Sequence, residues 1–315
     1  MTVTTAEMVR RPRRSRRPVW EEPPTPVGRV GKALVLTLVV LAVAFPLWVV
    51  VLTSLSSQAT VDAAGGLVVV PQGITPAAYL QIFSGGVVTR AVLVSTFITV
   101  AGTALSLFVT VLAAYGLSRP GSLWHRPLLF AVLLTFLFGP GIIPSYLVVK
   151  SLGMIDSYAS LIIPTAINAF NLVVLRAFFM NIPGELIDSA RIDGAGEFAI
   201  LRRIVLPLSK AVMAVVGLFY AVGYWNAFFN ALLYINTVEK WPLQLVLRLY
   251  VIEGASLPSG GGTGALQNSI AGMAPAPTLA LKMAIIVIAA LPAVLIYPFV
   301  QRHFTKGVIV GAIKG

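Results

Sequence analysis

The sequence predicts an all-α integral membrane protein with six transmembrane helices, and three observations carry this prediction. Of its 315 residues, 57% are hydrophobic and only 11% are charged, whereas a soluble domain of this length needs more charge on its surface. Uncharged runs of about the 20 residues that a helix needs to cross a bilayer recur along the chain. Polar or basic connections separate these runs. The runs are 33–53, 91–117, 127–149, 157–175, 211–238 and 283–301.

The charge distribution predicts two regions. Residues 1–30 are rich in arginine and proline and are expected to form a disordered basic tail, whereas residues 31–315 are expected to form one transmembrane domain. Six arginines lie within the first seventeen residues, and the formal net charge of the chain is +12. A basic tail beside a membrane helix more often sets topology or contacts anionic lipid than it binds nucleic acid. We therefore expect a lipid bilayer, and no nucleic acid, as its surroundings.

The positions of Lys and Arg predict that both termini are cytoplasmic. Besides the tail, the connections after the second and fourth runs and the C-terminal end carry clusters of basic residues, whereas the other connections carry few. Cytoplasmic loops hold such an excess of Lys and Arg, so we expect a multi-pass protein of the cytoplasmic membrane. The connections 54–90 and 239–281 then lie outside. In the second of these, Pro242–Tyr250 can form a short surface helix.

The connection between the fourth and fifth runs, with its segment 183–207, is the most informative one. Glu185 and Asp188 suit the positive N-terminal end of a short helix. Gly194 permits a break in the chain, after which residues 198–205 can form a second short helix. On these residues alone, the segment is either an amphipathic surface helix of an ordinary loop or a surface built to dock a partner.

The same segment matches the cytoplasmic signature of permease subunits of ABC importers: Glu-Ala-Ala, three residues, Gly, nine residues, Ile, any residue, Leu-Pro. Asp replaces the Glu and Ser replaces the first Ala. The residues on this spacing are Asp188, Ser189, Ala190, Gly194, Ile204, Leu206 and Pro207. Together with Gly139–Pro144 and the tail from Tyr297, they make the chain similar to the oligosaccharide branch of the maltose-type, binding-protein-dependent permeases.

The resemblance implies a function and a set of partners. In that family, two permease subunits pair, two ATPase subunits bind beneath them, and an extracytoplasmic solute-binding protein delivers the carbohydrate. The signature segment forms a coupling helix that docks on the ATPase, so Glu185 and the signature residues are expected to make this contact. ATP and Mg²⁺ are expected on the ATPase subunits, and this chain is expected to hold no cofactor and to be a transport subunit rather than an enzyme.

Other kinds of chemistry lack their residues. The chain has no phosphate-binding loop of the form G-x-x-x-x-G-K-[ST]. It has no cysteine, and its two histidines have no acidic residue at metal-binding spacing, so no metal site is expected. The main alternative is an ion-coupled secondary transporter, but such carriers place ionisable residues within their helices, and all six runs here are uncharged. A membrane anchor or scaffold without transport activity is the more distant alternative.

Uncharged polar and aromatic residues within the runs are candidates for the substrate path. Sugars present hydroxyls around apolar ring faces, so amides and aromatic rings suit them. The competing interpretation is that these side chains only join helices or lie at the membrane interface. The candidates are Tyr146, Asn168, Asn171, Tyr224, Trp225, Asn226 and Asn230, with Trp225 and Asn226 favoured.

Overall fold

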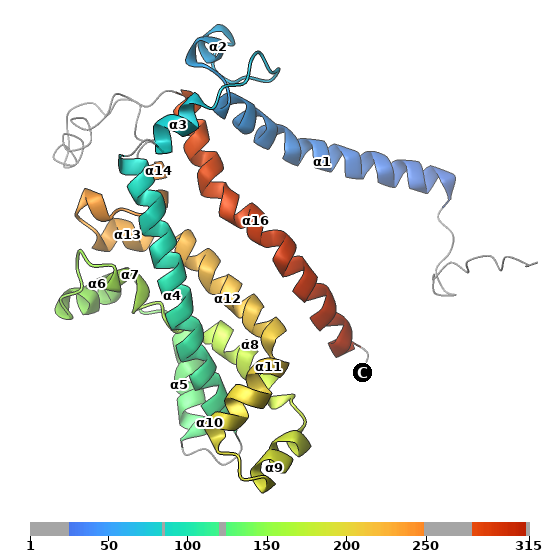
Figure 1. Cartoon of the computed structure of the whole chain (residues 1–315), viewed down its shortest axis with the longest axis vertical. Coiled ribbons are helices and arrows are strands. Elements are labelled where there is room, and N and C mark those ends of the chain that lie inside the picture. The colour runs from blue at the N-terminus through green and yellow to red at the C-terminus, as the bar shows by residue number, and fades with distance from the viewer. Residues whose placement is uncertain (1–24, 84–85, 120–123, 249–278, 313–315) are drawn as a thin grey trace, which may run out of the picture. The chain divides into compact units, whose positions relative to one another are not determined.

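The computed structural model describes residues 25–83, 86–119, 124–248 and 279–312, with side chains in the last stretch up to residue 295. All regular secondary structure in these ranges is helical (Figure 1), so the prediction of an all-α protein is confirmed. The chain divides into two compact units, residues 1–48 and 49–315, which are described separately.

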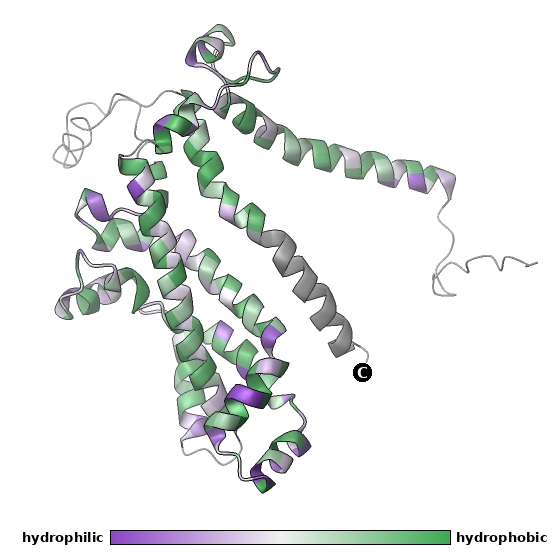
Figure 2. Ribbon diagram, in the orientation of Figure 1, coloured by the Kyte–Doolittle hydropathy of each residue, from purple (hydrophilic) through white to green (hydrophobic). Residues whose placement is uncertain are grey.

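The first unit consists, in its described part, of most of helix α1 (Pro26–Ser54). Pro26 opens the helix, where its missing N–H costs nothing. The helix thus begins inside the stretch 1–30 that the sequence predicted to be disordered, while residues 1–24 lie outside the described part. Large apolar side chains from Val27 to Trp48 are exposed, and Figure 2 shows this helix as mostly hydrophobic. An apolar helix surface of this extent is suited to contact with lipid or with protein.

The second unit is built around one long helix, α4. Helices α12 and α8 pack along α4, and α16 packs along α12. The long helices are α4 (Val87–Ser118), α8 (Ala169–Met180), α12 (Lys210–Trp225) and α16 (Leu279–Ala312). Short helices gather at the two ends of α4 (Figure 1). Near its start lie α3 (Ala77–Phe83) and α14 (Leu243–Arg248), and near its end lie α9 (Gly184–Ile192) and α10 (Glu197–Ile200). The short helix α2 (Gln58–Ala63) contacts α16.

Two of the described helices, α1 and α4, are long and apolar enough to cross a membrane unbroken. The number rises to five if each of three bent helix pairs counts as one span, and α16 contributes a shorter apolar helix over residues 279–295. The predicted runs 33–53 and 91–117 fall within α1 and α4. The runs 127–149, 157–175 and 211–238 are interrupted instead of straight.

The predicted run 127–149 falls on α5 (His125–Leu137) and α6 (Ile142–Ser151), and the chain bends by 120° between these two helices. The break falls at Gly139-Pro140-Gly141, where Gly141 has a φ of 81°. Proline cannot donate the next helical hydrogen bond, and glycine adopts a positive φ without steric cost. The apolar composition predicted the membrane location of this run but not the direction of its backbone.

The predicted run 157–175 begins with α7 (Ala159–Ile162), which ends before Pro164, and regular helix resumes only at α8. Asn168 caps α8, because its side-chain oxygen accepts a 3.1 Å hydrogen bond from the N–H of Asn171. The run 211–238 is likewise divided into α12, α13 (Phe229–Tyr234) and a final 3₁₀ turn.

Helix α14 corrects one expectation, because it is buried instead of lying on the surface. Leu243, Leu245 and Val246 are at most 3% exposed. Ser95 of α4 accepts a 2.7 Å hydrogen bond from the N–H of Leu243. The apolar residues of this helix therefore serve the core beside α4, which the sequence pattern alone did not indicate.

Polar contacts of one carboxylate join the connection between α6 and α7 to the segment after α13. The Asp156 carboxylate accepts hydrogen bonds from the N–H groups of Asn236 and Thr237, at 3.0 and 2.9 Å, and from the Lys240 ammonium at 2.8 Å. Partial burial opposes ionisation, but the hydrogen bonds from Lys240 and Thr237 hold the pKa of Asp156 well below its ordinary value. The Asp156 carboxylate thus remains ionised throughout the physiological pH range.

Candidate functional site

The signature segment forms two short helices separated by a capped turn. Gly194, with a φ of 80°, follows the end of α9. Its N–H donates to the carbonyl of Arg191 at 3.0 Å, and the N–H of Ala195 donates to the carbonyl of Ala190 at 2.9 Å. These two bonds form the Schellman arrangement that satisfies the last carbonyls of a helix. The backbone conformation therefore favours glycine at position 194.

The second helix of the segment runs from Glu197 to Leu208 and then bends by 84° into α12. Over Leu201–Val205 its hydrogen bonds have the wider π-helical spacing, and Pro207 follows within the last short turn. Proline lacks the N–H that an ordinary α-helical turn needs, and wider spacing is a common response within helices. The sequence predicted both helices, and the structure forms them.

The predicted coupling residues lie mostly on the outside of this segment. Glu185, Asp188, Ser189, Gly194 and Pro207 are exposed, whereas Ala190, Ile204 and Leu206 are half-buried. Figure 2 shows the segment as the most polar part of the second unit. The buried side of α9 is formed by Ile187, which is 6% exposed.

Three exposed apolar side chains accompany these residues, and the sequence interpretation did not single them out. Ile192 is 87% exposed, Phe198 72% and Leu186 47%. Isolated exposed apolar residues are normal, but three of them on a short polar segment mark a surface suited to a protein partner. A helical projection could have indicated Leu186, because this residue lies next to the buried position of Ile187 and off the inward-facing side of α9.

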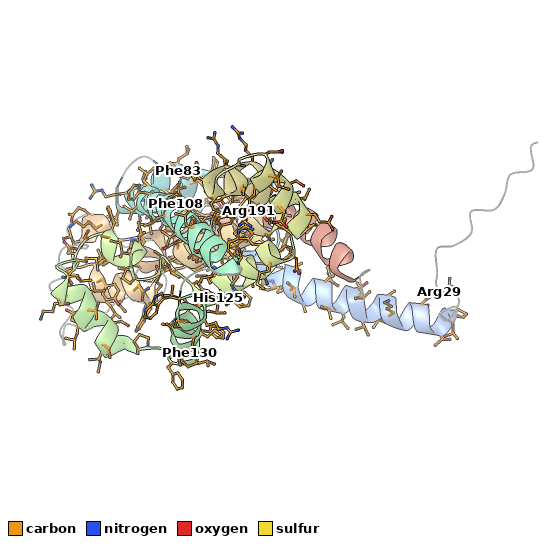
Figure 3. All side chains as sticks on the ribbon, turned by 90° about the horizontal axis from the view of Figure 1, so that it is seen from below. Arg29, Phe83, Phe108, His125, Phe130 and Arg191 are labelled. Carbon is orange, nitrogen blue, oxygen red and sulfur yellow. The ribbon has the colours of Figure 1, made fainter. Side chains whose placement is uncertain are left out.

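Glu197 connects the two short helices to the end of α4. Its Oε2 accepts a 2.5 Å hydrogen bond from the Tyr115 hydroxyl of α4, and its Oε1 accepts one of 2.8 Å from Nη2 of Arg191 on α9. The hydrogen bonds from Tyr115 and Arg191 lower the pKa of Glu197, so the carboxylate stays charged at neutral pH. Figure 3 views the molecule from the end where α9 lies and labels Arg191.

Arg176 of α8 joins α4 to α5 at the same end. Its Nε donates to the carbonyl of Leu117 at 2.9 Å, and its Nη2 lies 3.3 Å from Nε2 of His125. His125 thus takes part in helix packing. The described residues contain no group of three or more His, Asp or Glu side chains placed to hold a metal ion.

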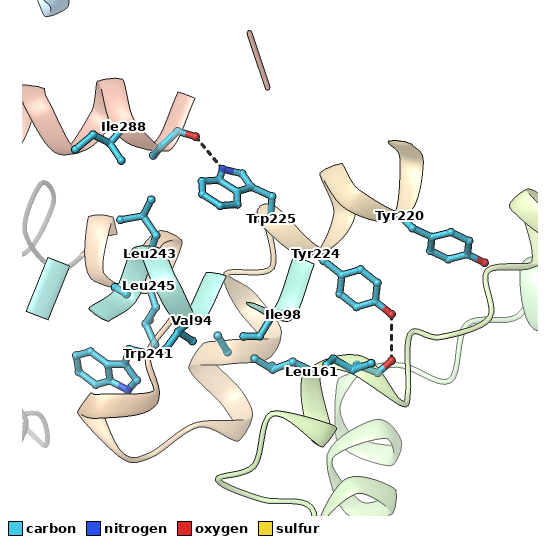
Figure 4. Close-up of a cluster of buried hydrophobic side chains, with 14 of the residues drawn as sticks. Val94, Ile98, Leu161, Tyr220, Tyr224, Trp225, Trp241, Leu243, Leu245 and Ile288 are labelled. Carbon is cyan, nitrogen blue, oxygen red and sulfur yellow. Dashed lines mark hydrogen bonds between the residues drawn. The ribbon is translucent and has the colours of Figure 1, made fainter. Parts of the chain in front are cut away.

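Helices α4 and α12 are joined by paired hydroxyl groups inside the bundle. Ser106 lies 2.7 Å from the Tyr224 hydroxyl, and Thr110 lies 2.7 Å from that of Tyr220. Tyr224 also donates to the carbonyl of Ile162 at 3.1 Å, which Figure 4 shows as a dashed line. Such bonds between helices in a membrane contribute about 0.6 kcal/mol each on average. The sequence interpretation did not single out Ser106 and Thr110. Gly102, Ser106 and Thr110 follow one another at a spacing of four residues, which is typical of a small-residue face on a helix.

The substrate-path candidates divide into packed and open residues. Tyr224 and Trp225 are 5% and 8% exposed, and the Trp225 indole N–H donates to the carbonyl of Ala289 at 2.9 Å (Figure 4). Asn171 is also buried, at 4% exposed. The ring of Tyr146 stacks on Tyr234 with 6.3 Å between centroids.

The remaining candidates are amides. Asn226 is exposed directly after the end of α12, with its amide nitrogen donating to the carbonyl of Val222 at 2.9 Å. Asn168 is exposed but serves as the helix cap, and Asn230 is half-buried. Asn168 and Asn226 are thus the two exposed amides among the candidates, and a substrate role for the set stays a prediction.

A cavity of about 450 Å³ opens between α3, α4, α12 and α16. Its walls include Phe83, Val100, Trp225 and Leu291, together with Tyr79, Thr96 and Thr99. Nearly all of this lining is apolar, which suits hydrocarbon better than sugar. None of the candidate asparagines lines it.

Comparison with known proteins identifies a family and several relatives of this chain. Residues 102–310 match the family described as "Binding-protein-dependent transport system inner membrane component". The chain is 48% identical over 248 residues to the polygalacturonan/rhamnogalacturonan transport system permease protein YtcP of Bacillus subtilis (strain 168), covering 79% of this chain and 85% of that protein. It is 27% identical over 303 residues to the sn-glycerol-3-phosphate transport system permease protein UgpE of Agrobacterium fabrum, covering 90% and 97%.

A solved structure shares the fold. A bacterial ABC transporter involved in the import of the acidic polysaccharide alginate has a chain that matches with a TM-score of 0.77 and 28% identity, covering 88% of this chain and 96% of that one. The family match spans well over half of the sequence, and the signature residues stand on an exposed helical segment within it. The chain therefore belongs to the binding-protein-dependent transport system inner membrane component family.

Proposed function

We propose that this chain is a permease subunit of an ABC importer that moves an oligosaccharide across the cytoplasmic membrane. ATP, with Mg²⁺, is bound and hydrolysed on separate ATPase subunits, and a second permease and an extracytoplasmic solute-binding protein complete the assembly. The observation that carries the proposal is the exposed segment at 183–207, which combines the signature spacing with an apolar and acidic outer surface. An ion-coupled secondary transporter is not favoured, since neither the family nor the uncharged spans support it.

The saccharide assignment is supported by the relatives. YtcP is named for polygalacturonan and rhamnogalacturonan, and the solved transporter imports alginate. Galacturonan and alginate are both polymers of sugar acids, so oligouronides are the first substrates to test. Uncharged spans do not oppose this, because an anionic sugar can be bound by amide and hydroxyl donors as well as by cations.

Six crossings are proposed, with both termini in the cytoplasm. They are α1, α4, α5 with α6, α7 with α8, α12 with α13, and α16. Irregular backbone within a span is tolerated only where protein or a water-filled path satisfies its polar groups. The interruptions in the third to fifth crossings therefore support a path along them, with Asn226 on its surface.

The decisive experiment is transport by the purified importer in liposomes. Vesicles containing both permeases and the ATPase subunits are expected to accumulate labelled oligogalacturonide only when ATP-Mg²⁺ is on the ATPase side and the binding protein is on the other. Dissipating proton and sodium gradients with ionophores should leave uptake unchanged. Uptake that needs an ion gradient and not ATP would establish the secondary-transporter alternative. Neutral maltooligosaccharides serve as the comparison substrate.

One cysteine-labelling experiment can test both the membrane topology and the place of Asn226 on the substrate path, because the chain contains no cysteine. Ile74 and Ile192 are 71% and 87% exposed, so single cysteines there will be reactive. In intact cells, an impermeant maleimide is expected to label Ile74→Cys and not Ile192→Cys. Asn226→Cys is expected to react from outside in the resting importer, and saturating substrate should protect it. Labelling of Ile192→Cys in intact cells would reverse the proposed topology, and an Asn226→Cys that substrate never protects would remove it from the path.

A further inference from the structure

We infer that Glu197 is a positioning residue that fixes the coupling segment to the end of α4, so that a movement of the segment is passed directly to that helix. The inference rests on the proposed function and adds a route by which the ATPase state reaches the spans. Glu197 stands outside the signature spacing, and only its contacts in the folded chain bring it to notice.

The first part of the link is its connectivity. One carboxylate joins three elements, since Tyr115 belongs to α4, Arg191 to α9, and Glu197 itself opens α10. The Tyr115 hydroxyl also lies 3.1 Å from the main-chain carbonyl of Glu197. Tyr115 is 9% exposed and therefore held firmly by the bundle. If α9 and α10 rotated while Tyr115 stayed in place, these hydrogen bonds would break.

The second part of the link is Arg119, which directly follows the last residue of α4. Its guanidinium lies 4.3 Å above the Tyr115 ring, and its Nε is 3.8 Å from Oε2 of Glu197. The Arg119 side chain is only 16% exposed, and its buried Nε and Nη2 have no hydrogen-bond partner within the described part of the chain. Among the described residues, Glu197 supplies the one carboxylate within ion-pair distance of Arg119.

These contacts differ in kind from an ordinary surface ion pair. Exposed pairs such as Arg191 with Asp188, at 3.7 Å and 70% exposure on the Asp side chain, contribute little because water screens them. The Glu197 side chain is 54% exposed, but its partners include a tyrosine that is 9% exposed and a guanidinium that is 16% exposed, so loss of the carboxylate removes the ion-pair partner of Arg119 and one of the two acceptors of the Tyr115 hydroxyl. Coupling through a shared carboxylate is therefore expected to be measurable.

The test uses the complete reconstituted importer. Glu197→Gln keeps the size of the side chain and removes its charge, so ATPase retention and basal hydrolysis are expected to persist while substrate-stimulated hydrolysis and uptake per ATP fall about tenfold, within the usual range of coupling between sites. Tyr115→Phe, which removes only the hydroxyl, is expected to show a smaller loss of the same kind. Glu197→Asp should recover part of the stimulation. Glu239→Gln removes one exposed carboxylate outside the segment and is expected to behave as the parent.

A distance measurement separates coupling from simple instability. Spin labels at Phe108→Cys on α4, 63% exposed and labelled in Figure 3, and at Ile192→Cys on α9 report the separation of the two elements. In the parent, the distance distribution should be narrow and unchanged by ATP, whereas Glu197→Gln should broaden it. A parent importer without ATP-driven uptake would refute the proposed function. A working parent in which Glu197→Gln alters neither the stimulation nor the distances would overturn the role of Glu197 alone.

Discussion

Replacing Gly194 with valine is expected to lower retention of the ATPase subunit about tenfold or more and to abolish uptake, while leaving membrane insertion intact. Gly194 has a φ of 80°, a conformation that costs an L-residue roughly 1–2 kcal/mol, with more expected for a β-branched one. A cost of 1.4 kcal/mol corresponds to a tenfold change in an equilibrium. The strain falls on the turn that orients α9 relative to α10, and no spanning helix is touched.

The chain provides a matched control two residues away. A Cβ at Gly194 or at Gly196 would have no neighbouring atom within 4 Å, but Gly196 has a φ of −72°. Gly196→Val therefore adds the same bulk without the backbone strain and is expected to retain more ATPase than Gly194→Val. Gly194→Asn should fall between them, since asparagine tolerates a positive φ. Affinity purification from detergent extracts, scored as ATPase recovered per permease, gives the comparison. Equal losses of ATPase with the two valine variants would show that side-chain bulk at the docking surface, and not the geometry of the turn, determines ATPase retention.

The sequence predicted the positions of the apolar helices better than their continuity. Composition determines which residues enter a bilayer, and α1 and α4 coincide with predicted runs. It does not determine where a helix breaks, because the breaks depend on local backbone groups. Gly139–Gly141 and the capping side chain of Asn168 bring about two of them. Both lie inside runs that are apolar enough to read as single spans.

For the candidate site, spacing revealed the segment but not its connections. The signature is a local pattern, so the residues from Asp188 to Pro207 could be assigned from the chain alone. Glu197 and Tyr115 are 82 residues apart, and no periodicity indicates that they meet. The same holds for Trp225, whose indole is directed to the carbonyl of Ala289 by the packing of α12 on α16.

Gly102→Ala is expected to separate α4 from α12 and to destabilise the folded permease by about 1–3 kcal/mol, the usual cost of overpacking a filled interior. A Cβ at Gly102 would lie 2.8 Å from two ring carbons of Tyr224. That ring cannot swing aside cheaply, because Tyr224 is 5% exposed and its hydroxyl is held by Ser106 and the carbonyl of Ile162. The clash therefore has to be relieved by moving one helix away from the other.

Gly116 in the same helix supplies the control, since a Cβ there meets nothing within 4 Å. Gly116→Ala is expected to be neutral or slightly stabilising, because alanine favours a helix over glycine by about 1 kcal/mol. The measurement is thermal unfolding of the detergent-purified permease, with complex yield as a second reading. In a Tyr224→Ala background, which removes the ring, the added cost of Gly102→Ala should nearly disappear. If Gly102→Ala melted at the temperature of Gly116→Ala, or if its cost survived removal of the ring, α4 and α12 would not pack through this contact in the membrane.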